Sequence, residues 1–559
     1  MDRDDGLDDE RRLIVSMMGQ TGISGSIVPT LGGEDRKAKN PRRVGEYLQR
    51  SRNPTDNVDS TQNLKCTARQ ELMLLRNGRI DESSTADNDN PNLANHRYSP
   101  RRRNIDLSQW MSDLETAEAE QLNQKHILKS RAAVDSPFTS RALKLCEGDD
   151  KYGRHVRAIR NISPGEVVAV ERSALTFVCP HRTYVYCSHC LKACWAARDC
   201  DYCIHSVYCS STCKRQAWLE YHSYECLVQA RLRTNDEDLC CLTGLTFVKA
   251  VLAIVHRVGG IDKLRNSVAH LRSSGGVDCS VTYGLDEIYN LDVGGIYCRK
   301  AREFSDYPEH EVTTWTLFAC RVAYLLVKET LFFGESRRGA SDSLRMIVED
   351  QDVLFVTALV LRSFLVFPFK HFYIYGYSEN CDKTDHLGTG VYQFCSNMNH
   401  SCNPNAEYFV TEDNELVVFA RQKIQKDSQI FIAYRNCKFT MAPRIERIRE
   451  LEKFYSFTCT CEACINDWST DTLVSFEDLT CKSKDYNKEK FNNFIHKLQS
   501  NLLCYGYNDG LKYLKETRKF FNFMAIQKIP VLSVPHYCLV QYIFMIFVKL
   551  FGHKLTSKL

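Results

Sequence analysis

An α+β fold divided into several domains is predicted by three features of the sequence. Apolar residues recur at spacings of three and four in Leu242–Val255, which indicates a helix that stops at Gly259-Gly260. Residues 406–419 read as a β-hairpin with its turn at Asp413-Asn414. Eight of the 26 cysteines lie in the range Cys187–Cys226, which indicates a separate cysteine-rich module. A chain of 559 residues has room for about three or four domains.

The other strands and helices follow from the same periodicities. Strands are predicted at Gly165–Val170 after the turn Ser163-Pro164, and at Ser428–Tyr434. A second helix is predicted from Thr314 to Phe333, and a third with a face formed by Ile445, Ile448 and Leu451. From about Asn466 the pattern is helical and carries no recognisable chemistry.

The first 135 residues differ in composition from the rest. Only three aromatic residues occur before residue 131, namely Tyr47, Tyr98 and Trp110, so this segment buries too little apolar surface to offset chain entropy. We predict a low-complexity, disordered extension with one short helix from Ile105 to Ser130. The basic run Ser99–Arg103 is interpreted as a solvated charge run rather than an import or phosphorylation signal.

Composition and charge exclude several classes of protein. The chain is 43% hydrophobic and 25% charged, which is the ordinary soluble mixture and not that of a collagen or a coiled coil. Lys plus Arg (73) exceeds Asp plus Glu (69) by only four charges. This balance gives no support to sequence-specific nucleic-acid binding.

The cysteines are expected to be reduced. Met1 is followed by Asp2, Arg3, Asp4 and Asp5, with no apolar core of a signal peptide. We therefore expect a protein of the cytoplasm and nucleus, where clustered thiols serve as metal ligands rather than disulfides.

One apolar stretch, Ile529–Val548, raises the question of a membrane span. Pro530, Pro535, His536 and Gln541 interrupt it, whereas a spanning helix needs about 20 mostly apolar residues. We expect a buried helix and no membrane association.

Eight potential metal ligands occur within 40 residues of the cysteine-rich module. They are Cys187-x2-Cys190, Cys200-x2-Cys203, Cys209-x3-Cys213 and His222-x3-Cys226. Zn²⁺ takes four N or S ligands tetrahedrally, so eight ligands predict two closed structural sites. The histidine is seventh of the eight, which argues against a RING-type ubiquitin ligase. Cys194 is expected to be a packing thiol, and His181, His189 and His205 surface histidines.

A polar heptad, Asn399–Asn405, separates an apolar segment from the hairpin. Three further motifs accompany it in order along the chain: Gly153–Ala158 with Pro164-Gly165-Glu166 before it, and Phe431–Tyr434 and Cys459-x-Cys461-x2-Cys464 after it. Taken alone, the heptad could be a simple surface turn. The three accompanying motifs disfavour that interpretation.

These motifs resemble the split SET domain of the SMYD family of SET and MYND domain-containing lysine methyltransferases. Tyr208-Cys209, Gln216-Ala217-Trp218 and His222 are similar to a MYND finger. The long N-terminal extension is similar to the branch of SET and MYND domain-containing protein 4, without the helical repeats of that branch, and divergent arthropod members fit comparably. The resemblance implies the following order: SET N-terminal part 142–186, MYND finger 187–226, helical insert 227–385, SET core 386–436, post-SET zinc region 437–465 and helical C-terminal region 466–559.

The resemblance also implies ligand sets. Cys187, Cys190, Cys209 and Cys213 would hold one zinc ion, and Cys200, Cys203, His222 and Cys226 a second. A third zinc ion would take Cys459, Cys461, Cys464 and, from the heptad, Cys402. Cys437 is the rival for that fourth position on proximity.

For S-adenosylmethionine, the resemblance implies binding by Asn399, His400, Phe457, the loop Gly153-Arg154 and Tyr434. Tyr434 would also be the catalytic tyrosine of the methyl-transfer channel, with Tyr455 in the lysine channel. The implied partners are a protein substrate with a target lysine and proline-rich peptides on the finger, and the expected state is a monomer.

Two positions depart from the family pattern. His155 stands where the family has the second glycine of Gly-x-Gly, and Gly376 where it often has asparagine. These departures favour the alternative function, a catalytically degenerate SET-MYND adaptor. The substrate, the degree of methylation and the roles of the two terminal regions do not follow from the sequence.

Overall fold

A computed structural model of the chain describes a defined set of residues. These are 8–19, 142–149, 153–232, 239–273, 303–339, 343–367, 371–378, 383–392, 394–475, 529–553 and 555, with single positions between 489 and 524. All of them belong to one of two compact units, formed by Met1–Leu31 and Ala117–Leu555. The predicted helix Ile105–Ser130 and the basic run Ser99–Arg103 lie outside the described residues, as does most of the predicted disordered extension.

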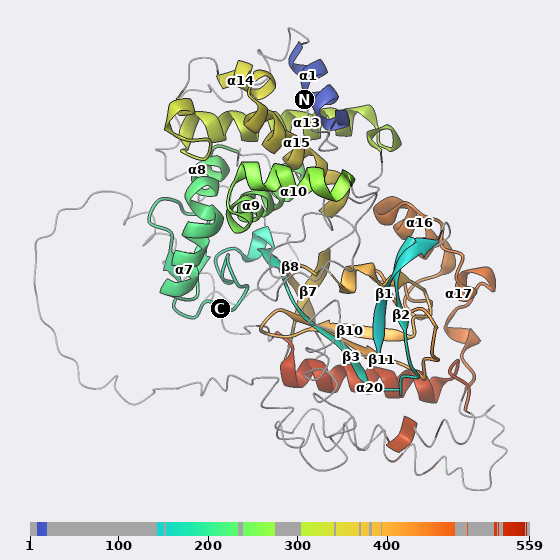
Figure 1. Cartoon of the computed structure of the whole chain (residues 1–559). Helices are drawn as coiled ribbons and strands as arrows, with labels where there is room; N and C mark the ends of the chain where they lie inside the picture. The colour runs from blue at the N-terminus through green and yellow to red at the C-terminus, as the bar shows by residue number, and fades with distance from the viewer. Residues whose placement is uncertain are drawn as a thin grey trace, which may run out of the picture. The chain divides into compact units, whose positions relative to one another are not determined.

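The described strands form small sheets (Figure 1). Their orders are β1-β2, β10-β11-β3, β12-β9, β4-β8-β7 and β5-β6. The strands are β1 Leu143–Asp149, β2 Gly153–Ala158, β3 Val167–Arg172, β4 Leu175–Val178, β5 Arg198–Asp199, β6 Val207–Tyr208, β7 His371–Tyr377, β8 Thr384–Val391, β9 Asn399–His400, β10 Ala406–Val410, β11 Glu415–Ala420 and β12 Phe431–Ile432.

The predicted hairpin is confirmed as β10 and β11. Its pairs run from Ala406↔Ala420 to Val410↔Leu416, and β3 pairs antiparallel with β11 on the other side. Asn414 has φ of 60°, a left-handed conformation that asparagine tolerates in tight turns. Because this turn projects from the sheet, it meets two other parts of the fold. The Asn414 amide donates to the carbonyl of Cys190 at 2.5 Å, and its Oδ1 lies 3.0 Å from Nε2 of His553.

The prediction of a strand over Ser428–Tyr434 is only partly correct. The regular strand β12 covers two residues, which pair in parallel with β9 as Phe431↔Asn399 and Ile432↔His400. The preceding residues instead bond to β2, where Ala158 N donates to Ser428 O at 2.9 Å and Ile430 N to Val156 O at 2.8 Å. The segment is therefore shared between two neighbours, which interrupts a regular ladder.

Helices between the strands form a separate packed layer (Figure 1). They are α7 Ser211–Ala217, the π-helical turn η3 Trp218–His222, α8 Ser223–Leu232, α9 Leu239–Val258, α10 Ile261–Ser273, α13 Glu309–Glu329, α14 Ser343–Glu349 and α15 Gln351–Val366. Helix α9 confirms the periodicity of Leu242–Val255. The second predicted helix is α13, which begins directly after Pro308, earlier than expected, and ends at Glu329, before the predicted Phe333. The predicted helical range 227–385 is wrong over β7 and the start of β8.

The prediction of disorder is wrong for residues 8–19, which form α1 (Asp8–Gly19). This helix packs against α15, α13 and α14. Ile14 is fully buried, and the buried carboxylate of Glu10 pairs with Arg362 at 2.7 Å. A long-range ion pair and the buried side chain of Ile14 hold a helix that local composition does not predict.

The post-SET segment contains α16 Arg444–Tyr455 and α17 Glu462–Ile465. The predicted face of α16 is wrong at Ile445, which is 57% exposed, and right at Leu451, which is fully buried. Arg447 on the same helix is fully buried, although the sequence periodicity did not assign it to the core.

The apolar stretch near residue 540 forms α20 (Val534–Phe551), which lies along the β10–β11 sheet (Figure 1). Phe547 stacks on Phe409 with ring centroids 5.3 Å apart and lies 5.1 Å from Phe419. The helix is long and apolar enough to cross a membrane by length and composition, yet 56% of it is buried inside the fold. The prediction of a buried helix is confirmed, while the absence of membrane association stays a prediction.

Candidate functional site

The structure gathers the first and third ligand pairs of the cysteine-rich module, as the resemblance implies. Cys187, Cys190, Cys209 and Cys213 place their Sγ atoms within 4.8 Å of one another. Cys209 follows β6, and Cys213 is held on the first turn of α7 because its backbone N–H donates to the capping hydroxyl of Ser210 at 3.1 Å. Four soft thiolates at this separation suit a tetrahedral zinc ion.

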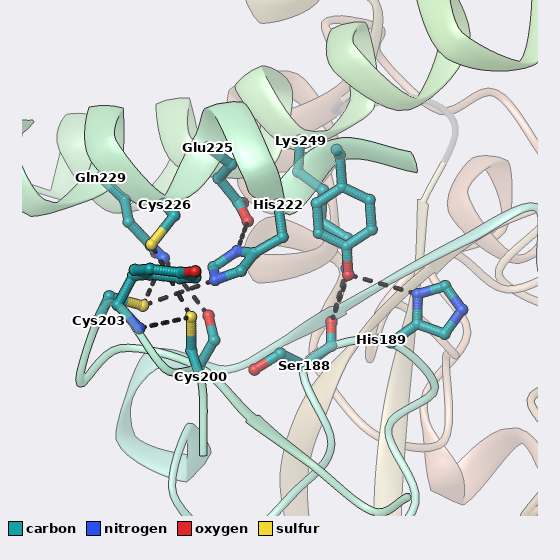
Figure 2. A network of polar contacts seen from close by, with 12 residues as sticks. Ser188, His189, Cys200, Cys203, His222, Glu225, Cys226, Gln229 and Lys249 are labelled. Carbon is teal, nitrogen blue, oxygen red and sulfur yellow. Dashed lines mark hydrogen bonds and ion pairs between the residues drawn. The ribbon is translucent and has the colours of Figure 1, made fainter. Parts of the chain in front are cut away.

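The second group combines Cys200, Cys203, His222 and Cys226 (Figure 2). Nδ1 of His222 lies 2.8 Å from the buried Glu225 carboxylate, so the ring donates there and turns Nε2 toward the sulfurs, 3.6 Å from Cys203 Sγ. A carboxylate that orients a histidine in this way is the usual outer shell of a zinc ligand. Sequence reasoning missed Glu225, although its place three residues after His222 puts both on one helical face.

The third group, hereafter the third cysteine group, consists of Cys402, Cys459, Cys461 and Cys464. Cys402 Sγ lies 3.5 Å from Cys464 Sγ, so the heptad and the post-SET segment meet here. The rival Cys437 is buried nearby but directs its Sγ to the carbonyl of Arg447, 4.0 Å away. The donor atoms of the third cysteine group suit Zn²⁺ as the first two groups do.

The remaining candidates of the module lie outside these groups. Cys194 is buried with its Sγ 3.7 Å from the Lys192 carbonyl, in keeping with a packing thiol. His181 is exposed and His205 half-buried. The expectation of a surface position is wrong for His189, which is half-buried with its ring stacked on Tyr221 at 6.1 Å.

The heptad runs beside residues 429–434, the segment that contains β12 and Tyr434. Beyond the β9–β12 pairing, Ser401 N donates to Ile432 O at 3.0 Å. The Asn405 side chain continues the contact, since its amide donates to Gln429 O and its oxygen accepts from Phe431 N, both at 2.8 Å. Asn399 donates to the side chain of Gln429 at 3.3 Å. Asn399, His400 and Tyr434 are therefore brought together, as the resemblance requires.

The contact between the heptad and residues 429–434 is hereafter called the crossing. Three aromatic side chains and one imidazole assemble beside it and form the aromatic group: Tyr434, Tyr455, Phe457 and His400. Ring centroids are 4.7 Å apart for Tyr434 and Tyr455, 5.2 Å for His400 and Tyr434, and 6.1 Å for His400 and Phe457. Burial raises the pKa of the Tyr455 hydroxyl and lowers the pKa of His400 to about 4. The group is therefore uncharged at neutral pH.

The hydroxyl of Tyr434 is fixed within this group. It donates a 2.9 Å hydrogen bond to the carbonyl oxygen of Met398, the residue immediately before the heptad. Because its single proton is committed to that carbonyl, the phenolic oxygen faces other groups as an acceptor.

The loop Gly153-Arg154 begins β2, which lies next to residues 428–430 and beside the turn Cys395–Asn397 that leads into the heptad. Gly153 has φ of 59°, and a Cβ there would meet nothing within 4 Å. The side chain of Arg154 lies outside the described part of the chain. Gly153 is thus on the strand that borders the crossing, in the open left-handed conformation that glycine allows.

The two departures from the family pattern have structural explanations. His155 is buried, with Nδ1 2.9 Å from the Gly153 carbonyl and Nε2 accepting from Arg157 at 2.7 Å, so its ring closes the start of β2. At Gly376 a Cβ would lie 2.8 Å from the Leu555 side chain and 3.0 Å from that of Leu387. A side chain at this position would require the ends of the Leu555 and Leu387 side chains to move, so glycine is the residue that fits without rearrangement.

Two buried charged residues support the site and were not found by sequence reasoning. Glu171 on β3 accepts from the backbone N–H groups of Phe394 and Cys395 at 2.9 and 2.8 Å, which holds the turn before the heptad. Lys249 on α9 donates to the carbonyls of Thr176 and Ser188, each at 2.7 Å, between β4 and the cysteine-rich module (Figure 2). An acidic residue in an apolar strand and a lysine in an apolar helix were the available signals.

The sequence matches a known protein family over the region that contains this site. A family model described as the SET domain matches residues 153–435, half of the chain. The chain belongs to the SET domain family. The match begins at Gly153 and ends just after Tyr434, so the crossing and β2 both lie inside it.

Several curated proteins are similar to this SET domain protein. It is 25% identical to the protein-lysine N-methyltransferase SMYD4 of Pongo abelii, over 72% of this chain and 57% of that protein. Identity to the human protein of the same name is 26%, over 58% of this chain and 46% of that protein. The histone-lysine N-methyltransferase ASHR1 of Arabidopsis thaliana is 24% identical over 56% of this chain and 53% of that protein.

This SET domain protein spans about half the length of the curated relatives it matches. The domain match, together with the repeated similarity to SMYD4 proteins, supports the resemblance to the SMYD family stated above from motifs.

Proposed function

We propose that this SET domain protein is a protein-lysine N-methyltransferase that transfers a methyl group from S-adenosylmethionine to a lysine side chain. The observation that carries the proposal is the parallel pairing of β9 with β12, because it puts Asn399 and His400 beside Phe431 and Ile432, just before Tyr434 in the chain. The names of the relatives, which are lysine methyltransferases, support the same reaction.

The aromatic group fits the cofactor and the substrate chemically. A sulfonium ion and an alkylammonium ion are both attracted to aromatic faces, and Tyr434, Tyr455 and Phe457 supply three such rings within 6.5 Å of one another or of His400. When bound, S-adenosylmethionine supplies an activated methyl group. The protein then has to align the amine with that methyl group and exclude water.

Deprotonation of the lysine is favoured by the same residues. A free lysine ammonium has a pKa of ~10.4 and has no lone pair for attack. Uncharged surroundings disfavour the ammonium by desolvation, which lowers its pKa. The Tyr434 oxygen, whose proton is bonded to Met398, would then accept an N–H of the amine and direct its lone pair away from the ring.

We also propose that the cysteine-rich module is a MYND finger with two zinc ions, and that the third cysteine group holds a third. All three would be closed structural sites, because each offers four protein ligands and leaves no position for water. At this size bound metal replaces a hydrophobic core, so metal removal would unfold the module.

One surface of the module supports a second role, the binding of proline-rich peptides. Tyr202 is 73% exposed and stacks on Trp218 with centroids 5.0 Å apart, and Leu219 is 59% exposed. Exposed aromatic rings of this kind accept extended proline-rich chains. This is also the surface that an adaptor without catalytic activity would use. A cytoplasmic and nuclear location, a monomeric state and a lack of nucleic-acid and membrane partners remain parts of the proposal.

Cofactor binding and methyl transfer test the proposal together. Calorimetry with S-adenosylmethionine should give saturable binding, and transfer of a labelled methyl group to protein substrates should be lost in Tyr434→Phe while cofactor binding persists. Undetectable cofactor binding by the folded, zinc-loaded chain would end the enzyme proposal and leave the adaptor.

A further inference from the structure

The side chain of His400 joins the third cysteine group to the backbone of Tyr434. Its Nδ1 lies 2.9 Å from the backbone nitrogen of Tyr434, and its Nε2 lies 3.3 Å from the Sγ of Cys402. Only 8% of the residue is exposed. Both ring nitrogens are thus engaged by the protein on opposite edges of the imidazole.

The two partners determine the tautomer of His400. A backbone N–H can only donate, so Nδ1 is the acceptor and carries no proton. The single proton of the neutral ring is then on Nε2 and points at the sulfur. A hydrogen bond from N–H to a thiolate is charge-assisted, and it fixes the rotation of the ring. His400 is therefore a rigid connection with a defined direction.

We propose that this connection positions Tyr434: the Cys402 sulfur holds the His400 ring, and the ring holds the backbone of Tyr434 and with it the hydroxyl bonded to Met398. His400 is accordingly a positioning residue for the proposed methyl transfer, in addition to the cofactor contact that the family resemblance implies. This inference rests on the proposed function for its kinetic test but not for its structural test.

Arg447 provides a matched control on the same group. It is fully buried, and one guanidinium nitrogen lies 3.9 Å from the Sγ of Cys464. Its other hydrogen bonds go to the carbonyls of Ala442, Ala463 and Trp468. Zn²⁺ with four thiolates has a net charge of two minus, so a buried guanidinium offsets part of the charge. Arg447 therefore supports the third cysteine group, and among the described residues it makes no hydrogen bond to His400 or Tyr434.

Three variants of the full chain separate the two halves of the connection. His400→Ala removes both hydrogen bonds. His400→Asn keeps an acceptor close to the position of Nδ1 but is too short to reach Cys402. Arg447→Met disturbs the third cysteine group but removes neither hydrogen bond of His400. If Arg447→Met does not fold, Arg447→Lys is used in its place.

The structural readouts do not need catalysis. In the cadmium-113-substituted chain, all variants should shift the NMR resonance of the third cysteine group and leave that of the group with His222 unchanged. Hydrogen exchange of the Tyr434 amide should accelerate in His400→Ala, less in His400→Asn, and stay as in the wild type in Arg447→Met.

The kinetic readout separates positioning from general damage. With zinc loaded, kcat of His400→Ala should fall by about 10- to 100-fold, the usual range for outer-shell partners, with little change in KM for the protein substrate. The kcat of His400→Asn should lie between those of the wild type and His400→Ala, and the kcat of the Arg447 variants should stay close to that of the wild type.

Three results would overturn the inference. One is a Tyr434 amide that exchanges at the wild-type rate in both His400 variants. Another is full kcat in His400→Asn despite a shifted cadmium resonance, because the sulfur would then contribute nothing. The third is a zinc-loaded Arg447 variant as impaired as His400→Ala. If the wild type transfers no methyl group at all, the proposed function fails, while hydrogen exchange and cadmium NMR still decide the connection.

Discussion

The Nζ atom of Lys249 lies 2.7 Å from the carbonyl oxygen of Ser188, between two cysteines of the first ligand pair. The same amine bonds the Thr176 carbonyl and lies over the ring of Tyr221, 4.7 Å from its centroid. One buried cation on α9 therefore joins β4 to the cysteine-rich module. The module is attached to the rest of the fold by a charge that has no acidic hydrogen-bond partner among the described residues.

This arrangement predicts an unusual pH dependence of stability. Burial lowers the pKa of Lys249 to about 8, while Glu225 and Glu220 oppose the shift and Arg257 adds to it. An unfolded lysine has a pKa of ~10.4, so between these values the unfolded chain binds more protons and stability rises with pH. Denaturant unfolding at about pH 7.5 and about pH 9.5 should show this gain in the wild type and not in Lys249→Met. Equal pH slopes for the two proteins would contradict it.

Metal analysis should give three zinc ions per chain. Replacement of a ligand in the third cysteine group, Cys464→Ser, should reduce the content to two, because the remaining three donors leave a tetrahedron incomplete. Cys437→Ser is the matched control, since Cys437 is buried in the same cluster but outside the ligand set. Mass spectrometry under non-denaturing conditions measures both. Loss of one ion in Cys437→Ser and none in Cys464→Ser would reverse the assignment.

The attachment of α1 can be measured as a coupling energy. Glu10 and Arg362 form a buried pair, and burial raises the pKa of Glu10. Removing one partner leaves an uncompensated charge, so Arg362→Met should destabilise the protein by about 3–5 kcal/mol and release residues 8–19 to hydrogen exchange. The double variant Glu10→Gln/Arg362→Met should recover part of the loss. Strictly additive effects would show that the pair is not formed.

Glu171 should stabilise the turn that leads into the heptad. Glu171→Gln replaces one of the two oxygens that accept from Phe394 and Cys395 with an NH₂ group, which cannot accept. Loss of a hydrogen bond to a buried charge predicts destabilisation of about 1–3 kcal/mol. Glu446→Gln, an exposed position on α16, is the control and should be neutral. Thermal unfolding of the two variants decides the matter, and equal midpoints would refute the role of Glu171.

Short-range patterns predicted the elements that local chemistry determines. The ligand spacings of the cysteine-rich module and the triplet Cys459–Cys464 indicate metal-binding clusters, and such clusters are present. The periodicity of Leu242–Val255 predicted α9, and the turn at Asp413-Asn414 predicted the hairpin. In each case the residues that determine the structure lie within one segment of at most 40 residues.

Buried charges were not predictable in the same way. Charged residues are normally expected at the surface. The apolar sequence around Lys249 and Glu171 was a signal of burial, but the groups that satisfy these charges belong to distant segments and could not be identified from the sequence. Helix α1 was missed for the same reason, since its ion-pair partner is 352 positions away. The two-residue length of β12 likewise depends on β2 and β9 competing for one segment.

Helix α20 also has a consequence for how the chain folds during synthesis. Its Phe547 packs against Phe409 and Phe419 on the hairpin. These two side chains therefore lack this contact with α20 until the helix has been synthesised. Contacts this distant in sequence form late and slowly. Before α20 packs, the apolar face of the hairpin is exposed and favours aggregation. We expect chaperones to act at this stage of folding.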